Sequence, residues 1–90
     1  MTSVTRKVQI TNKRGLHARA SARFVALASA QSAMIEVEKD GNKVVGTSIM
    51  GLMMLGAAIG DYVTIYASGV GADRAVSALA DLVEQKFGEE

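Results

Sequence analysis

The chain has 90 residues, with ten lysines and arginines against nine aspartates and glutamates, which gives a formal net charge of +1. That length makes one small domain without room for a deep substrate cavity beside a separate catalytic apparatus, so a carrier, a binding module or a regulator is favoured over a self-sufficient enzyme. The near-neutral net charge excludes a strongly basic overall surface of the kind that attracts nucleic acids or membranes. The absence of cysteine excludes disulfides and thiolate metal sites.

The first third of the chain predicts a strand, a turn and a helix. Alternating apolar and polar residues from Val4 to Ile10 are typical of a half-buried strand. Residues 12–15 are polar and turn-like, and an alanine-rich amphipathic helix is predicted from Ala18 to about Ala30. Basic residues gather in this third, which indicates a positive patch suited to phosphate or to an acidic partner; a merely solvated basic face is the alternative.

The middle of the chain predicts a hairpin followed by a short helix. Alternation returns over residues 33–38, and Asp40-Gly41-Asn42 is a good hairpin signal leading into a short strand at 43–45. Thr47 or Ser48 then caps a short helix whose leucines are expected to be buried.

The last two elements are a strand over residues 62–67 and a helix that opens at Asp73 and ends at Gly88. Apolar residues recur at helical spacing in that helix, at Val76, Leu79, Ala80, Val83 and Phe87. The order β-α-β-β-α-β-α implies a two-layer α+β sandwich, and we expect residues 1–90 to form a single domain. Pattern alone does not separate this architecture from a ferredoxin-like one, which shares the first six elements.

The only histidine, His17, stands between the first strand and the first helix, in Gly15-Leu16-His17-Ala18-Arg19. The free N–H groups and positive dipole end of a helix N-terminus favour an anion such as phosphate. An imidazole can attack a phosphoryl group to form a phosphohistidine, and Arg19 can pair with the phosphate oxygens. A surface or packing histidine is the alternative. A metal centre is disfavoured because there is no second histidine or cysteine, and a serine hydrolase because there is no nucleophile elbow.

A second cluster surrounds the short helix. Ile49, Met50 and Met53 are interpreted as an exposed, adaptable patch for partners, with burial in the core as the alternative. Ser48 is either an ordinary helix cap or a regulatory hydroxyl, and chemistry alone favours the cap.

Other ligand classes are disfavoured. Gly69-Val70-Gly71 lacks the rest of a nucleotide loop, so any phosphate must come from another protein. An RNA-binding sheet predicts exposed aromatic residues, and only Tyr62 and Tyr66 are candidates. Residues 1–7 lack the apolar core of a signal peptide, and the apolar stretch at 49–59 is too short to span a bilayer. We expect a soluble cytoplasmic protein.

Two motifs resemble one known family. Gly15-Leu16-His17-Ala18-Arg19 resembles the active-site signature of HPr, the histidine-containing phosphocarrier of the bacterial phosphoenolpyruvate phosphotransferase system. Ser48-Ile49-Met50-Gly51-Leu52-Met53 resembles the regulatory-serine segment of the same family. The resemblance covers essentially the whole chain, and it implies an open-faced β-sandwich, in which a four-stranded antiparallel sheet is covered on one face by three helices.

The resemblance also implies roles for individual residues. His17 would accept phosphate on Nδ1 from phosphorylated enzyme I and pass it to an enzyme IIA domain, while Arg19 would neutralise the phosphate. Ser48 would match the serine modified by HPr kinase/phosphorylase in lineages that have it. The family's docking surface would correspond to Ile49, Met50 and Met53. We expect a monomer without cofactor, metal, nucleic-acid partner or independent catalytic activity.

The chain departs from the family pattern at Ala20, where the family usually has proline. Proline suits a first helical turn because its φ is preset, so alanine gives up some rigidity near His17. The branch of the family is left open. Residues 10–13 and 87–90 resemble the nitrogen-related version, NPr, while residues 48–51 look more like the kinase-regulated sugar-type version.

Overall fold

The computed structural model describes residues 3–89. The elements are β1 (Ser3–Gln9), α1 (Ala18–Ser29), β2 (Met34–Lys39), β3 (Asn42–Val45), α2 (Ile49–Met54), β4 (Tyr62–Ser68), α3 (Ala72–Glu84) and a 3-10 turn, η1 (Lys86–Gly88). The predicted order β-α-β-β-α-β-α is confirmed. The single domain over residues 1–90 stays a prediction, because Met1, Thr2 and Glu90 lie outside the described residues.

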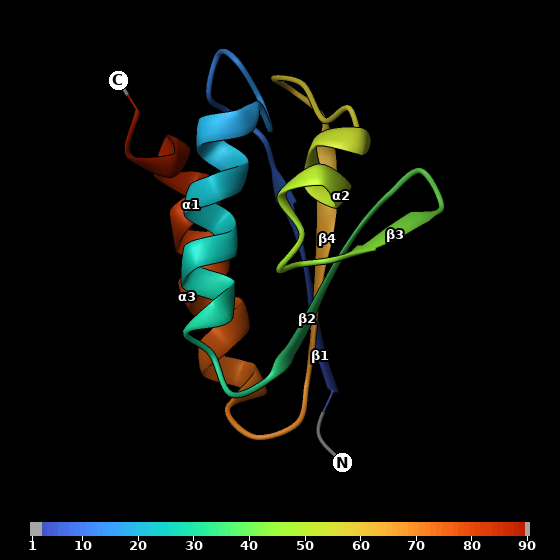
Figure 1. The fold of residues 1–90 in the computed structure, drawn as a ribbon, viewed down its shortest axis with the longest axis vertical. Helices are drawn as coiled ribbons and strands as arrows, with labels where there is room; N and C mark the ends of the chain where they lie inside the picture. Colours follow the sequence, from blue (N-terminus) through green and yellow to red (C-terminus); the bar gives the residue numbers. More distant parts are fainter. Residues whose placement is uncertain (1–2, 90) are drawn as a thin grey trace.

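The four strands form one antiparallel sheet in the order β1-β4-β2-β3. Figure 1 shows α1 and α3 side by side along one face of this sheet, with α2 beside the N-terminal half of α1. The predicted open-faced α+β sandwich is therefore confirmed. The β2–β3 hairpin turns at Asp40 and Gly41, whose φ angles of 52° and 83° belong to the mirror-image turns that fit twisted strands.

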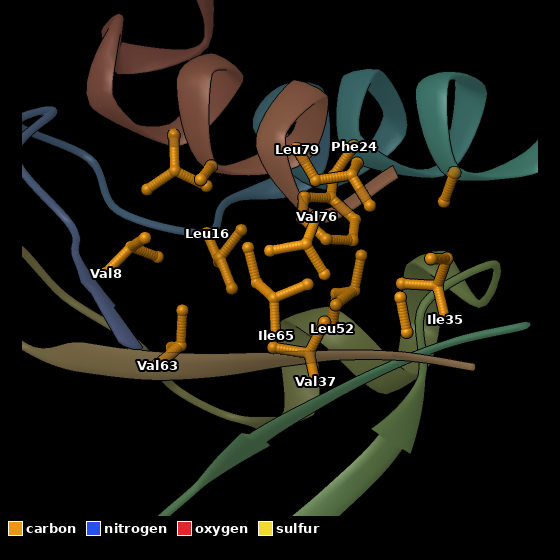
Figure 2. Packing of buried hydrophobic residues seen from close by; sticks show 14 of the residues in the cluster. Val8, Leu16, Phe24, Ile35, Val37, Leu52, Val63, Ile65, Val76 and Leu79 are labelled. Atoms are coloured by element: carbon orange, nitrogen blue, oxygen red, sulfur yellow. The ribbon is translucent and has the colours of Figure 1, made fainter. Parts of the chain in front are cut away.

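The core lies between the sheet and the helices, where alternate strand residues meet the apolar sides of α1 and α3 (Figure 2). β4 contributes Val63, Ile65 and Ala67, all buried, while the residues between them face the open side of the sheet. Leu52 and Leu55 are buried too, as expected for the short helix. This layer fixes the N-terminal end of α1 relative to α2 and to the end of the chain.

The predicted end of the last helix is wrong. α3 begins at Ala72 and stops at Glu84, and the next residues reverse direction through left-handed φ angles of 58° at Lys86, 57° at Phe87 and 77° at Gly88. Phe87 is fully buried, as its spacing suggested, but it enters the core from this turn. Burial of its ring and a hydrogen bond from Arg23 to its carbonyl hold the turn against the cost of left-handed backbone.

Candidate functional site

The backbone places His17 as the N-cap of α1, which confirms its predicted position at the mouth of a helix. Its φ and ψ are −75° and −179°, and its carbonyl accepts a hydrogen bond from the amide of Ser21 at 2.9 Å. The imidazole makes no capping bond, so no side-chain cap covers the first-turn amides of α1. Ala20 is fully buried in that turn, so the helix forms here without the family's usual proline.

The loop that leads to His17 is docked on the loop after α2. Gly15 has a φ of 62°, and a Cβ built on it would lie 2.3 Å from the carbonyl oxygen of Ala57. The amide of the next residue, Leu16, donates to the same oxygen at 3.0 Å. Only glycine fits this close approach, which fixes the backbone immediately before the histidine.

The carboxylate of Glu89 lies against the His17 ring, a contact that the sequence did not predict. Its Oε2 is 2.6 Å from Nε2 of His17, and its Oε1 accepts a hydrogen bond from the side-chain amide of Asn12 at 3.1 Å. Asn12 is fully buried and also donates to the carbonyl of Gly15 at 2.8 Å. The His17 and Glu89 side chains are only 17% and 15% exposed, so water competes weakly for this pair.

The charge state of Glu89 decides the arrangement of protons on the ring. Burial by itself raises the pKa of this carboxyl, but hydrogen bonds from Asn12 and His17, with the charges of His17 and Arg19, outweigh burial and lower the pKa below its ordinary value. An ionised carboxylate only accepts hydrogen bonds, so Nε2 of His17 must donate. In a neutral ring the lone pair is then on Nδ1, which has no hydrogen-bond partner among residues 3–89.

Basic side chains gather next to Glu89, as the basic first third of the chain predicted. A hollow of about 420 Å³ is lined by Lys13, Arg14, Arg19, Arg23, Gly88 and Glu89, so it adjoins the carboxylate that contacts His17. Arg14 and Arg19 are exposed, so their guanidinium groups can reorient toward an anion, whereas Arg23 is held by its hydrogen bond to the Phe87 carbonyl. The loop before α1, the first turns of α1 and residues 88–89 thus build one positively charged site.

Ser48 and the predicted patch lie on α2. Ser48 is the N-cap of that helix, and its Oγ accepts a hydrogen bond from the amide of Gly51 at 2.9 Å, so the capping interpretation is confirmed. The predicted patch is exposed at all three positions, Ile49, Met50 and Met53. Two further exposed apolar residues, Met54 and Ile59, were not predicted.

Sequence reasoning missed Asn12 and Glu89. The basic N-terminal third was interpreted as a positive patch suited to phosphate or to an acidic partner, and no contact between His17 and an acidic side chain of the same chain was predicted. Within residues 3–89, no helix is long and apolar enough to cross a bilayer. The same residues contain no group of three or more histidine, aspartate or glutamate side chains placed to hold a metal ion.

Known proteins resemble the chain over nearly its whole length. A family model described as the PTS HPr component phosphorylation site matches residues 4–85. HPr of Neisseria meningitidis is 45% identical over 82 residues, covering 91% of this chain and 92% of that protein. NPr of Shewanella violacea is 40% identical over 89 residues, covering 99% and 98%. A crystal structure of HPr from Thermoanaerobacter tengcongensis superposes with a TM-score of 0.89 at 51% identity, over 100% of this chain and 99% of that chain. The chain therefore belongs to the HPr family of phosphocarrier proteins of the phosphotransferase system.

Proposed function

We propose that the chain carries a phosphoryl group on Nδ1 of His17, taken from phosphorylated enzyme I and passed to an enzyme IIA domain. The observation that supports this most directly is the hydrogen bond from Nε2 to Glu89, because it leaves the lone pair on Nδ1. That lone pair attacks the phosphorus atom. The Nδ1–phosphorus bond forms as the donor's nitrogen–phosphorus bond breaks, and the electron pair of that bond stays with the donor ring.

Charge around the ring supports the same step. Phosphoryl transfer depends mostly on positioning and on neutralising the transferred group, and Arg19 is two residues from His17 and lines the same hollow as Glu89. The uncapped first-turn amides of α1 and the positive end of its dipole add donors for the phosphate oxygens. The Glu89 carboxylate lies against Nε2, where it stabilises the positive charge that the ring gains when Nδ1 is phosphorylated.

The exposed apolar residues around α2 supply a docking surface for both partners. We assign to it Ile49, Met50 and Met53, which the family resemblance suggests, with Met54 and Ile59 as extensions. α2 packs beside α1, so a partner on this surface also reaches the end of α1 that carries His17 (Figure 1).

A regulatory role for Ser48 is a second, compatible proposal. HPr kinase/phosphorylase would add a phosphate at the N-cap of α2, beside the docking surface. A phosphate brings nearly two negative charges, which weakens docking of an acidic partner on an apolar patch. Replacement of Ser48 by aspartate therefore weakens binding to enzyme I, and unchanged binding would contradict this second proposal.

The carrier function is tested by incubating the protein with phosphoenolpyruvate and enzyme I. Wild-type protein gains an acid-labile phosphate, and the His17→Ala variant gains none. Enzyme I must first be shown to phosphorylate another carrier, so that an absence of label on wild-type protein counts against the proposal. We infer that the chain works in the cytoplasm as a monomeric carrier, with no catalytic activity of its own.

A further inference from the structure

The turn after α3 is held in a conformation that isolated residues avoid. Lys86 and Phe87 have left-handed φ angles of 58° and 57°, a region that residues with a side chain normally avoid. Three contacts hold the turn: the buried ring of Phe87, the bond from Arg23 to the Phe87 carbonyl, and the bond from Asn12 to Glu89. A terminal segment kept in strained backbone by contacts from distant elements indicates a geometric requirement at its end.

The residue that follows this turn is Glu89, and its carboxylate contacts Nε2 of His17. The two residues are 72 positions apart, and the turn brings the chain back across the first turns of α1 to reach the ring. Glu89 is itself oriented, because Asn12 binds its other oxygen and is tied by a second bond to the Gly15 carbonyl. The ring is therefore anchored through Glu89 to the loop that precedes it.

We propose that Glu89 is a positioning residue, which fixes the proton of the neutral His17 ring on Nε2 and thereby presents Nδ1 to the phosphoryl donor. The rate effect of this role rests on the proposed carrier function. Glu89 does not touch the phosphoryl group; it acts through the ring. When Nδ1 is phosphorylated, the same carboxylate faces the Nε2–H of a positively charged ring, so the anchor is retained through the transfer.

The test combines ring ¹⁵N spectra with transfer kinetics. His17 is the only histidine, so long-range ¹H–¹⁵N spectra at mildly alkaline pH report its tautomer without ambiguity. Glu89→Ala raises the ratio of the Nδ1–H to the Nε2–H tautomer about tenfold, as expected for loss of one charge-assisted hydrogen bond. The rate of phosphoryl transfer from phosphorylated enzyme I falls by about tenfold for the same reason. Glu84→Ala, which removes an equal charge from the exposed end of α3, changes neither quantity.

A second variant displaces the carboxylate without removing it. Gly88 has a φ of 77°, and a Cβ there would lie 3.1 Å from Nη1 of Arg23, so Gly88→Ala disturbs the turn and moves Glu89. It shifts the tautomer ratio and the rate in the same direction as Glu89→Ala. Gly41→Ala is the matched control, since Gly41 has a φ of 83° in a turn far from the site with open space around it.

The outcomes separate this inference from the carrier function. An unchanged tautomer ratio in Glu89→Ala, with normal labelling of wild-type protein, would overturn the positioning role and leave the carrier function standing. A changed ratio with no label on wild-type protein would overturn the carrier function and support the anchoring of the ring. An unchanged rate despite a changed ratio would overturn the contribution of the anchor to transfer.

Discussion

His17 and Ser48 occupy the same backbone position in two different helices, yet the structure uses them in opposite ways. Each is an N-cap in an extended conformation. The Ser48 hydroxyl oxygen accepts a hydrogen bond from the backbone amide of Gly51 at the start of its own helix. The His17 ring instead forms a hydrogen bond with Glu89 and leaves its own helix uncapped. A satisfied cap stabilises a helix. An unsatisfied one leaves amides and an imidazole accessible, so the comparison separates a structural cap from the cap that we propose to be reactive.

The side chains around the two N-cap residues also differ, because those near His17 are basic and those near Ser48 are apolar. The hollow next to Glu89, the partner of His17, is lined by four basic side chains, Lys13, Arg14, Arg19 and Arg23. Ser48 is followed by exposed apolar residues on α2. The first environment suits a transferred phosphate and the second a protein partner, and the four predictions below test this division from the largest expected effect to the smallest.

Arg19→Ala is expected to slow phosphorylation of His17 by about a hundredfold, because it removes a charged donor from the transferred group. The measurement is the initial rate of label transfer from phosphorylated enzyme I. Arg74→Ala, which removes an exposed arginine from α3, is the matched control and leaves the rate unchanged. If Arg19→Ala and Arg74→Ala are phosphorylated at the same rate, Arg19 does not contribute to phosphorylation of His17.

Met50→Ser is expected to weaken binding to enzyme I about tenfold, since an exposed apolar anchor is lost from the proposed docking surface. Titration calorimetry measures the dissociation constant. Met34→Ser is a close control, because Met34 is 73% exposed against 71% for Met50 but lies on the strand β2. If both variants bind with the wild-type constant, α2 is not the docking surface.

Ser48→Ala is expected to lower the free energy of unfolding by about 1 kcal/mol through loss of the cap, while the rate at which His17 accepts phosphate stays unchanged. Urea unfolding and the transfer assay measure the two quantities. Thr47→Ala serves as control, since Thr47 is exposed and is not the residue that caps α2. A loss of stability in Thr47→Ala and not in Ser48→Ala would show that Thr47 caps α2.

The smallest effect is the pH dependence of stability that comes from Glu89. Its pKa is lower in the folded chain than its ordinary value, so its contribution is complete above that ordinary value and is lost as pH falls through the lower, folded pKa. The charged groups that face this carboxylate or line the hollow with it are His17, Lys13, Arg14, Arg19 and Arg23.

Urea unfolding at about pH 7 and about pH 3 measures this contribution as a difference in stability. The difference is expected to be smaller in Glu89→Ala than in wild-type protein. It stays at the wild-type value in Glu84→Ala. Equal differences in wild-type protein and in Glu89→Ala would show that the carboxylate gains nothing from its neighbours on folding.

Local patterns were sufficient for most of the fold. The alternation in β4, the Asp40-Gly41 turn and the alanine-rich helix α1 can each be recognised from residues close together in the sequence, and each is present as expected. The end of α3 was predicted wrongly for a related reason. The helical spacing of Phe87 gave the correct burial but the wrong backbone, because the turn depends on Arg23 of α1.

By itself, the sequence determined the element order, the apolar residues of the core, the place of His17 at a helix end and the exposure of the patch on α2. These follow from periodicity and from the conformational preferences of residues close together in the chain. Only the tertiary structure decided that Glu89 returns to His17 and that Asn12 holds it there. Those contacts join residues more than 70 positions apart, and their geometry depends on how α1, α3 and the sheet pack together, which no local pattern encodes.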